Sequence, residues 1–114
     1  MSIQFLKKTA SMNTLEDRGS VPVPLSEPAC RVRGLDVRIP GSDVDAGVWE
    51  CSPGRFQRQV ASGEVMHILS GACSFTPTGG EPVQIGAGDT LFFPANTTGV
   101  WHIRETVRKV FVLV

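Results

Sequence analysis

Glu64 is the residue whose type and setting best suit proton-transfer chemistry. It lies within the stretch Gly47 to Gly71, and Met66 and Ile68 follow it at alternate positions. Alternate side chains on a β-strand share a face, so both apolar side chains are expected to wall the Glu64 carboxylate. Desolvation raises the proton affinity of a carboxylate unless a cation or an amide donor compensates. Glu64 is therefore a candidate catalytic general base.

A structural role for Glu64 is the alternative. Arg55, Arg58 and two glutamines, Gln57 and Gln59, lie shortly before it. Any of these side chains could hold a buried glutamate in place, and buried ion pairs also perturb proton affinity. The residues alone leave both interpretations open.

The elements that must position these residues are predicted to be β-strands. From Cys30 onward, short β-rich segments alternate with turn clusters, and no segment has sustained helical periodicity. Turn signals at such short intervals are typical of an antiparallel sandwich or barrel. We expect an all-β fold, with residues 1–28 as an N-terminal arm and edge segment and residues 29–114 as one domain.

Glycine and proline mark the expected turns. Pro53-Gly54 predicts a hairpin-like corner at residues 52–55. Gly79-Gly80 predicts a hairpin tip, and residues 86–89 predict a second turn.

Two strands are expected near the ends of the chain. A short strand is predicted at Ile3 to Leu6. The last strand, Val107 to Val114, is apolar on both faces except for Arg108 and Lys109. This pattern predicts cover on both faces, which a neighbouring subunit could supply.

Charge and hydropathy exclude several classes of protein. The 114 residues include 11 basic and 11 acidic side chains, and a net charge of zero argues against a nucleic-acid partner. The sequence has no apolar run of the roughly 18 residues that a membrane helix needs, and no secretory signal pattern. We expect a cytoplasmic protein without a membrane partner.

The cysteines are predicted to be structural. Cys30, Cys51 and Cys73 are an odd number without CxxC spacing, which argues against a disulfide framework or a zinc site. Free cysteine commonly behaves as a small buried hydrophobe. No catalytic role is assigned to Cys51, because no neighbour that would stabilise its thiolate is identifiable.

Two spacings resemble the cupin motifs G-x5-HxH-x3/4-E-x6-G and G-x5-PxG-x2-H-x3-N. Glu64 precedes Gly71 by six intervening residues, and Gly88 precedes Pro94 by five. The segments WECSPGRF, GEVMHILSG, GGEPVQIGAGDTLFFPAN and TGVWHIRETVRKVFVLV are similar to small cupins related to ureidoglycine aminohydrolase and to the ethanolamine-utilisation cupin. The resemblance implies an RmlC-like jelly roll, that is, a double-stranded β-helix barrel over residues 29–114.

The ligand histidines of the cupin motifs are missing. Counting back from Glu64 places the first two at Gln57 and Gln59, and counting forward from Gly54 places them at Val60 and Ser62. The third falls at Gly99. Amide oxygens bind borderline metals more weakly than imidazoles do. We therefore expect no tightly bound transition metal and no other cofactor, and the metal-dependent aminohydrolase activity is not carried over.

The resemblance also implies which residues line the lumen of the barrel. Glu64, Gln57 and Gln59 take motif positions, and Trp101 shares the strand face of Gly99. Trp101 and Trp49 could stack on a planar ligand or fill the core.

Both histidines are expected to lie outside the site. His67 and His102 have the wrong parity for the lumen unless a bulge intervenes. We expect them to be structural or surface residues.

Two functions follow, from different classes. The first is a small-molecule-binding cupin, sensing a nitrogenous or carboxylated metabolite, with little or no catalysis. The second is an enzyme that acts on such a metabolite by acid–base chemistry at Glu64, with or without a weakly bound metal. A dimerisation module is a third possibility that leaves the polar lumen unexplained. A homodimer is expected in each case, because an edge strand and the apolar C-terminal strand invite pairing.

Overall fold

The fold is an antiparallel barrel of eight β-strands. The computed structural model describes residues 3–114, and no helix occurs among them. The prediction of an all-β jelly-roll barrel is confirmed. The strands are β1 Glu16–Ser20, β2 Arg31–Val37, β3 Ala46–Cys51, β4 Gly54–Gln57, β5 Glu64–Pro77, β6 Val83–Gly86, β7 Thr90–Phe93 and β8 Gly99–Leu113.

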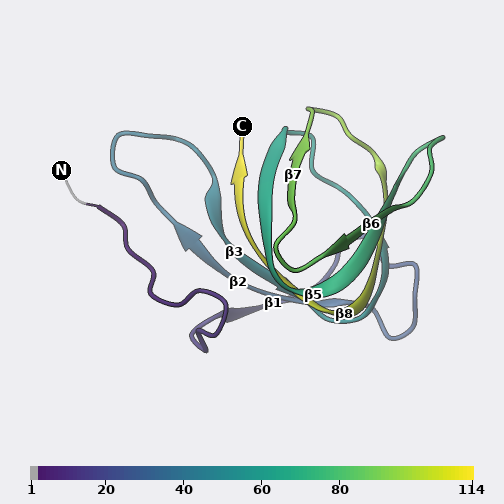
Figure 1. Cartoon of the computed structure of the whole chain (residues 1–114), viewed down its shortest axis with the longest axis horizontal. Coiled ribbons are helices and arrows are strands. Elements are labelled where there is room, and N and C mark those ends of the chain that lie inside the picture. The colour runs from purple at the N-terminus through teal and green to yellow at the C-terminus, as the bar shows by residue number, and fades with distance from the viewer. Residues whose placement is uncertain (1–2) are drawn as a thin grey trace.

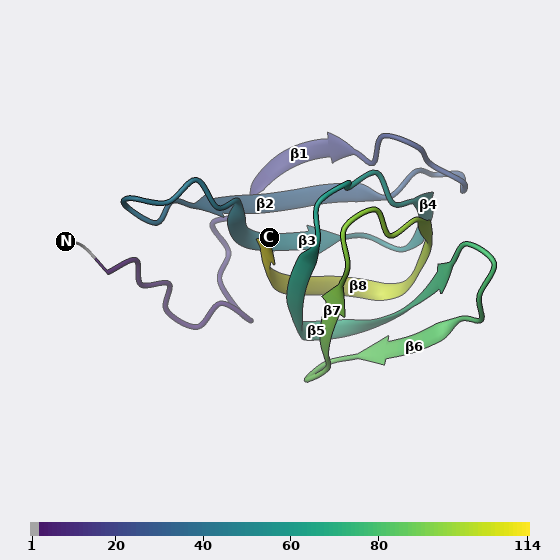
Figure 2. The same ribbon diagram turned by 90° about the horizontal axis from the view of Figure 1, so that it is seen from above.

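The two long strands, β5 and β8, form the centre of the barrel. They pair with each other along most of their length. The second half of β8 also pairs with β3, and its first half pairs with β4. The first half of β5 pairs with β7, and its second half pairs with β6. Each long strand thus runs through both walls of a curved sheet that folds over on itself (Figures 1 and 2).

Gly71 lets β5 turn the corner between the two walls. The β5–β8 register shifts between Ile68 and Cys73, and Gly71 has φ +96°. A Cβ atom at this position would lie 2.2 Å from the Thr106 carbonyl oxygen of β8. Only glycine combines this backbone conformation with so close an approach of two strands.

The prediction of a hairpin-like corner at residues 52–55 is wrong. β3 and β4 run in the same direction along β8, with Cys51 opposite Val107 and Gly54 opposite Ile103. At Pro53-Gly54 the chain therefore bends but keeps its direction along β8, instead of reversing as it would in a hairpin. The turns at residues 78–80 and 86–89 are confirmed, because they join β5 to β6 and β6 to β7.

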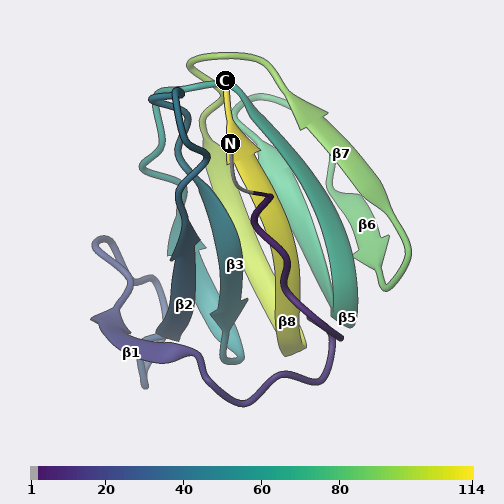
Figure 3. The same cartoon turned by 90° about the vertical axis from the view of Figure 1, so that its left-hand side faces the viewer.

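The N-terminal residues lie against the sheet without joining it. Residues 3–6 do not form the expected strand, and the first strand is β1. The Arg108 guanidinium donates to the carbonyl oxygens of Thr9 (2.9 Å) and Met12 (2.7 Å). Figure 3 shows this segment crossing in front of β8. It therefore covers part of the outer face of the last strand.

The segment from Val21 to Pro28 lies alongside β4. Val23 accepts a backbone hydrogen bond from Gln57, and Leu25 donates one to Arg55. Part of the cover on the outer face of β8 thus comes from the N-terminal residues of the same chain. No helix in residues 3–114 is long and apolar enough to cross a bilayer.

Candidate functional site

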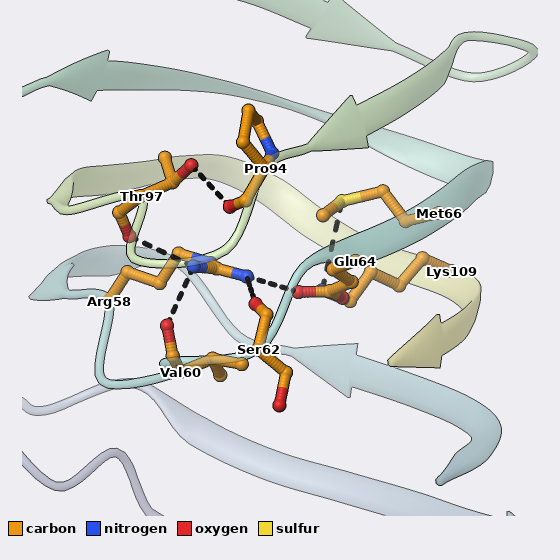
Figure 4. Close-up of polar contacts among 8 residues, drawn as sticks. All are labelled: Arg58, Val60, Ser62, Glu64, Met66, Pro94, Thr97 and Lys109. Carbon is orange, nitrogen blue, oxygen red and sulfur yellow. Dashed lines mark hydrogen bonds and ion pairs between the residues drawn. The ribbon is translucent and has the colours of Figure 1, made fainter. Parts of the chain in front are cut away.

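Glu64 opens β5 and is held by two cations. Its Oε1 accepts from Arg58 Nη2 at 3.0 Å, and its Oε2 accepts from Lys109 Nζ at 2.7 Å. The side chains of Arg58, Glu64 and Lys109 are 2%, 4% and 8% exposed. Figure 4 shows the carboxylate between the two positive groups. We call these three residues the ion cluster.

Arg58 is fixed by the loop in which it lies. It follows β4, and its guanidinium is surrounded by backbone carbonyl oxygens (Figure 4). Nη1 donates to Val60 (2.8 Å) and Thr97 (2.9 Å), and Nη2 reaches Ser62 at 3.4 Å as well as Glu64. Arg58 therefore joins the loop before β5 to the loop before β8. These contacts hold the two loops and the Glu64 carboxylate in position.

Lys109 enters the interior from the middle of β8. Its ammonium lies 4.4 Å from the ring centre of Trp49, 5.5 Å from that of Trp101 and 5.9 Å from that of Phe111. Burial lowers the pKa of Lys109, and the attraction of Glu64 offsets part of that effect. The result is a desolvated amine enclosed by electron-rich ring faces.

A cavity of about 310 Å³ opens above the ion cluster. Its walls include Trp49, Phe56, Trp101 and Phe111, together with aliphatic side chains. Trp101 is itself held by Phe75, at 4.9 Å between ring centres, and by stacking on Phe93 at 5.7 Å. The cavity thus has closely packed aromatic walls and charged groups at its base, the arrangement expected of a small-molecule pocket.

The predicted site residues divide into two groups. Glu64 and Trp101 are buried and Trp49 is half-buried, and all three line the cavity. Gln57 and Gln59 also line it, but both are exposed, and Gln59 donates to the Arg58 carbonyl oxygen at 3.2 Å. The two glutamines are thus the exposed part of the lining and lie at the mouth of the cavity.

Lys109 is the site residue that the sequence did not indicate, whereas Arg58 was among the expected partners of Glu64 and does bind it. Phe56 and Arg58 are the buried side chains of their stretch, so the cation takes the inward position that was assigned to the glutamines. Lys109 shares its parity with Trp101, Val107 and Phe111. Between Val107 and Leu113, Lys109 is the only charged residue at this parity, and that was the signal that could have identified it.

The residues at this site do not fit a transition metal ion. Glu64 is the only carboxylate that lines the cavity among residues 3–114, and each of its oxygens already binds a cation. His67 and His102 are both exposed, as expected, and His67 Nδ1 contacts Thr90 Oγ1 at 2.8 Å. No group of three or more potential ligands from His, Cys, Asp and Glu occurs in the described part of the chain.

The cysteines are buried and free, as predicted. Burial raises the pKa of Cys51 well above its usual value and that of Cys73 to about 11. Both thiols are therefore poor nucleophiles at neutral pH.

Comparison with known proteins identifies the family of the chain. The family model described as the EutQ-like cupin domain matches residues 40–111. No curated protein matches the chain.

Solved structures support the same fold. A structure described as the ethanolamine utilization protein EutQ of Salmonella typhimurium is 24% identical, with a TM-score of 0.64 over 73% of this chain and 68% of that one. A DUF861 family protein from Thermotoga maritima is 30% identical, with a TM-score of 0.57. The match covers 59% of this chain and 76% of that one. A DUF861 protein of unknown function from Pseudomonas syringae has a TM-score of 0.79 at 20% identity, and the match spans 90% of this chain but 45% of that one.

Proposed function

Because the chain belongs to the EutQ-like cupin family, we propose that its barrel binds a small organic molecule without a tightly held transition metal. The observation that carries this proposal is the ion cluster at the floor of an aromatic-walled cavity of about 310 Å³. A cavity of this size lies at the lower end of the roughly 300–1,000 Å³ range of ligand pockets. A metabolite of modest size would fill it.

The ion cluster also argues against a metal at this site. A divalent ion that bound Glu64 would have to displace Arg58 or Lys109 from the carboxylate. It would then lie beside two buried positive charges, which is unfavourable in a medium of low dielectric constant. The resemblance to ureidoglycine aminohydrolase therefore does not extend, in this proposal, to its metal-dependent activity.

A ligand screen with matched variants tests the proposal. Thermal shifts would be measured with a metabolite library for the wild type, for Trp49→Leu in the cavity wall and for Phe92→Leu, whose ring is exposed outside the cavity. A ligand of the cavity should stabilise the wild type and Phe92→Leu but stabilise Trp49→Leu much less. Equal stabilisation of all three proteins would place binding elsewhere and refute the proposal.

Metal analysis provides an independent test. Protein purified without chelator should contain far less than one transition metal ion per chain. A full equivalent of iron, manganese or zinc that is lost in Glu64→Gln would refute the metal-free proposal.

Acid–base catalysis at Glu64 is a second candidate, favoured by one contact. The 2.7 Å distance between Glu64 Oε2 and Lys109 Nζ allows a proton to pass between the two groups. A compound that wild-type protein consumes, and that Glu64→Gln binds but leaves unchanged, would establish an enzyme. Recovery of every bound compound unaltered from the wild type would favour the binding function.

We further propose a cytoplasmic homodimer. Three unpaired cysteines support a reducing compartment. β1 and β6 end the strand order and offer free backbone groups for pairing with a second copy. A monomeric mass by light scattering across a concentration series would refute the dimer.

A further inference from the structure

The cavity carries an excess of positive charge. Among the residues that the structure describes, three charged side chains line it: Arg58 and Lys109 are positive and Glu64 is negative, so the balance is one positive charge. We infer that the cavity binds a small organic monoanion, a carboxylate on an apolar body, with its charged end on Lys109. This inference rests on the proposed function and names the class of ligand.

Arg58 is not the group that meets the ligand. Both of its terminal nitrogens already donate, to three backbone carbonyl oxygens and to Glu64. The partial negative charges of those carbonyl groups surround the guanidinium. Arg58 therefore holds Glu64 and the adjoining loops in position.

Lys109 retains capacity to donate. An ammonium carries three N–H groups. In the described residues, Lys109 Nζ has one oxygen acceptor, Glu64 Oε2 at 2.7 Å, and a weak contact with Met66 Sδ at 3.8 Å. The rings of Trp49 and Trp101 also lie close to it. A ligand carboxylate would supply a second oxygen acceptor to a cation that is otherwise poorly solvated.

The aromatic walls do not favour a cationic ligand. Clusters of aromatic rings can bind ammonium ligands through their electron-rich faces. Here the Lys109 ammonium already lies over the rings of Trp49 and Trp101, at 4.4 Å and 5.5 Å from their centres. A cationic ligand would meet two buried positive charges, whereas an anionic ligand would bring the net charge of the cluster to zero. Charge and geometry thus select the same class of ligand.

The ligand would lie between the charged floor and the polar mouth. Its apolar body would contact Trp49, Phe56 and Phe111, which line the cavity. The exposed amides of Gln57 and Gln59 would be available to any polar group at its outer end.

Two sets of matched probes test this inference on the wild-type protein. The first set is benzoate, benzamide and benzylammonium, and the second is hexanoate, hexanamide and hexylammonium. Affinities would be measured at neutral pH by ligand-detected NMR and calorimetry. At least one carboxylate should bind ten or more times as tightly as its amide and its ammonium counterpart.

Variants locate the binding. Lys109→Met keeps the length of the side chain and removes the charge, and it should weaken carboxylate binding at least tenfold. Lys8→Met, at an exposed position, should leave binding unchanged. Folding of each variant would be confirmed by circular dichroism, and the probe selectivity of the wild type remains decisive if Lys109→Met does not fold.

The outcomes separate the inference from the proposed function. Binding of an amide or an ammonium probe as tightly as the carboxylate would overturn anion selectivity and leave a ligand-binding cavity. Carboxylate binding that survives Lys109→Met would overturn the assignment of Lys109. Failure of all six probes to bind at millimolar concentration would overturn the inference, and the metabolite screen with Trp49→Leu would then decide the proposed function separately.

Discussion

The two oxygens of Glu64 are the point at which two distant parts of the chain meet, residues 58–64 and Lys109. Removing a charge from water is costly, so a buried ion pair stabilises the fold only when its partners are well placed. Glu64 meets this condition because each oxygen has its own cation, at 3.0 Å and 2.7 Å. Loss of the carboxylate charge would leave Arg58 and Lys109 as uncompensated buried cations.

Glu64→Gln should therefore destabilise the protein strongly. Breaking a buried ion pair on one side costs about 3–5 kcal/mol. We expect a loss of this order in the free energy of unfolding, measured by urea titration. Glu105→Gln, at an exposed position of β8, should change it by less than about 0.5 kcal/mol.

The double variant Glu64→Gln/Lys109→Met checks the cause. It removes one cation together with the anion, so it should be more stable than Glu64→Gln alone. Additive losses in the double variant would show that Glu64 and Lys109 do not interact.

The inward position of Glu64 was predictable, and Arg58 was among its expected partners, but Lys109 was not. Met66 and Ile68 on the same strand face indicated burial, and both are buried. Lys109 lies 45 positions away along the chain, and only the pairing of β5 with β8 brings it to Glu64. Arg58 and Gln57 differ by one position, and strand parity alone does not say which face is inward.

At the scale of elements, the bend in β5 determines the shape of the barrel. Gly71 allows two strands to approach at the corner where the register shifts. Gly79, at the β5–β6 hairpin, has a similar positive φ of +76° but nothing within 4 Å of a Cβ atom.

Gly71→Ala should destabilise the protein more than Gly79→Ala does. Both variants place alanine in left-handed backbone, which costs roughly 1–2 kcal/mol. Gly71→Ala adds a clash with the Thr106 carbonyl oxygen. Urea unfolding of the two variants measures the difference, and equal losses would show that the close approach at the corner contributes nothing.

The β type of the elements was predictable from turn residues and alternation, but their bounds and one connection were not. Gly79-Gly80 was identified as a hairpin tip, whereas Pro53-Gly54 bends a path that continues along β8. Both dipeptides favour a turn locally. The difference depends on which strand the chain pairs with afterwards, and that is set by the barrel as a whole.

At the scale of the whole molecule, the buried thiols make stability depend on pH. Burial raises the pKa of Cys73 from 9.0 to about 11. Between these values the unfolded chain releases the thiol proton while the folded protein keeps it, so the contribution of Cys73 to stability falls as pH rises.

Comparison with Cys73→Ala isolates this contribution. The advantage of the wild type over Cys73→Ala should be largest below pH 9 and should shrink as the pH rises toward 11. Urea unfolding of both proteins at pH 8, 9 and 10 in the presence of reductant measures it. A constant advantage across this range would contradict the prediction.

Because Arg108 and Lys109 lie on opposite faces of β8, their contacts can form only in the native register of this strand. A slip of one residue between β5 and β8 would exchange the two faces. Lys109 would then point to solvent, and Arg108 would lose the Thr9 and Met12 carbonyl oxygens that it now binds. A misaligned chain would lose both sets of contacts at once, so Lys109 inside the barrel and Arg108 outside it together favour the native register of β8.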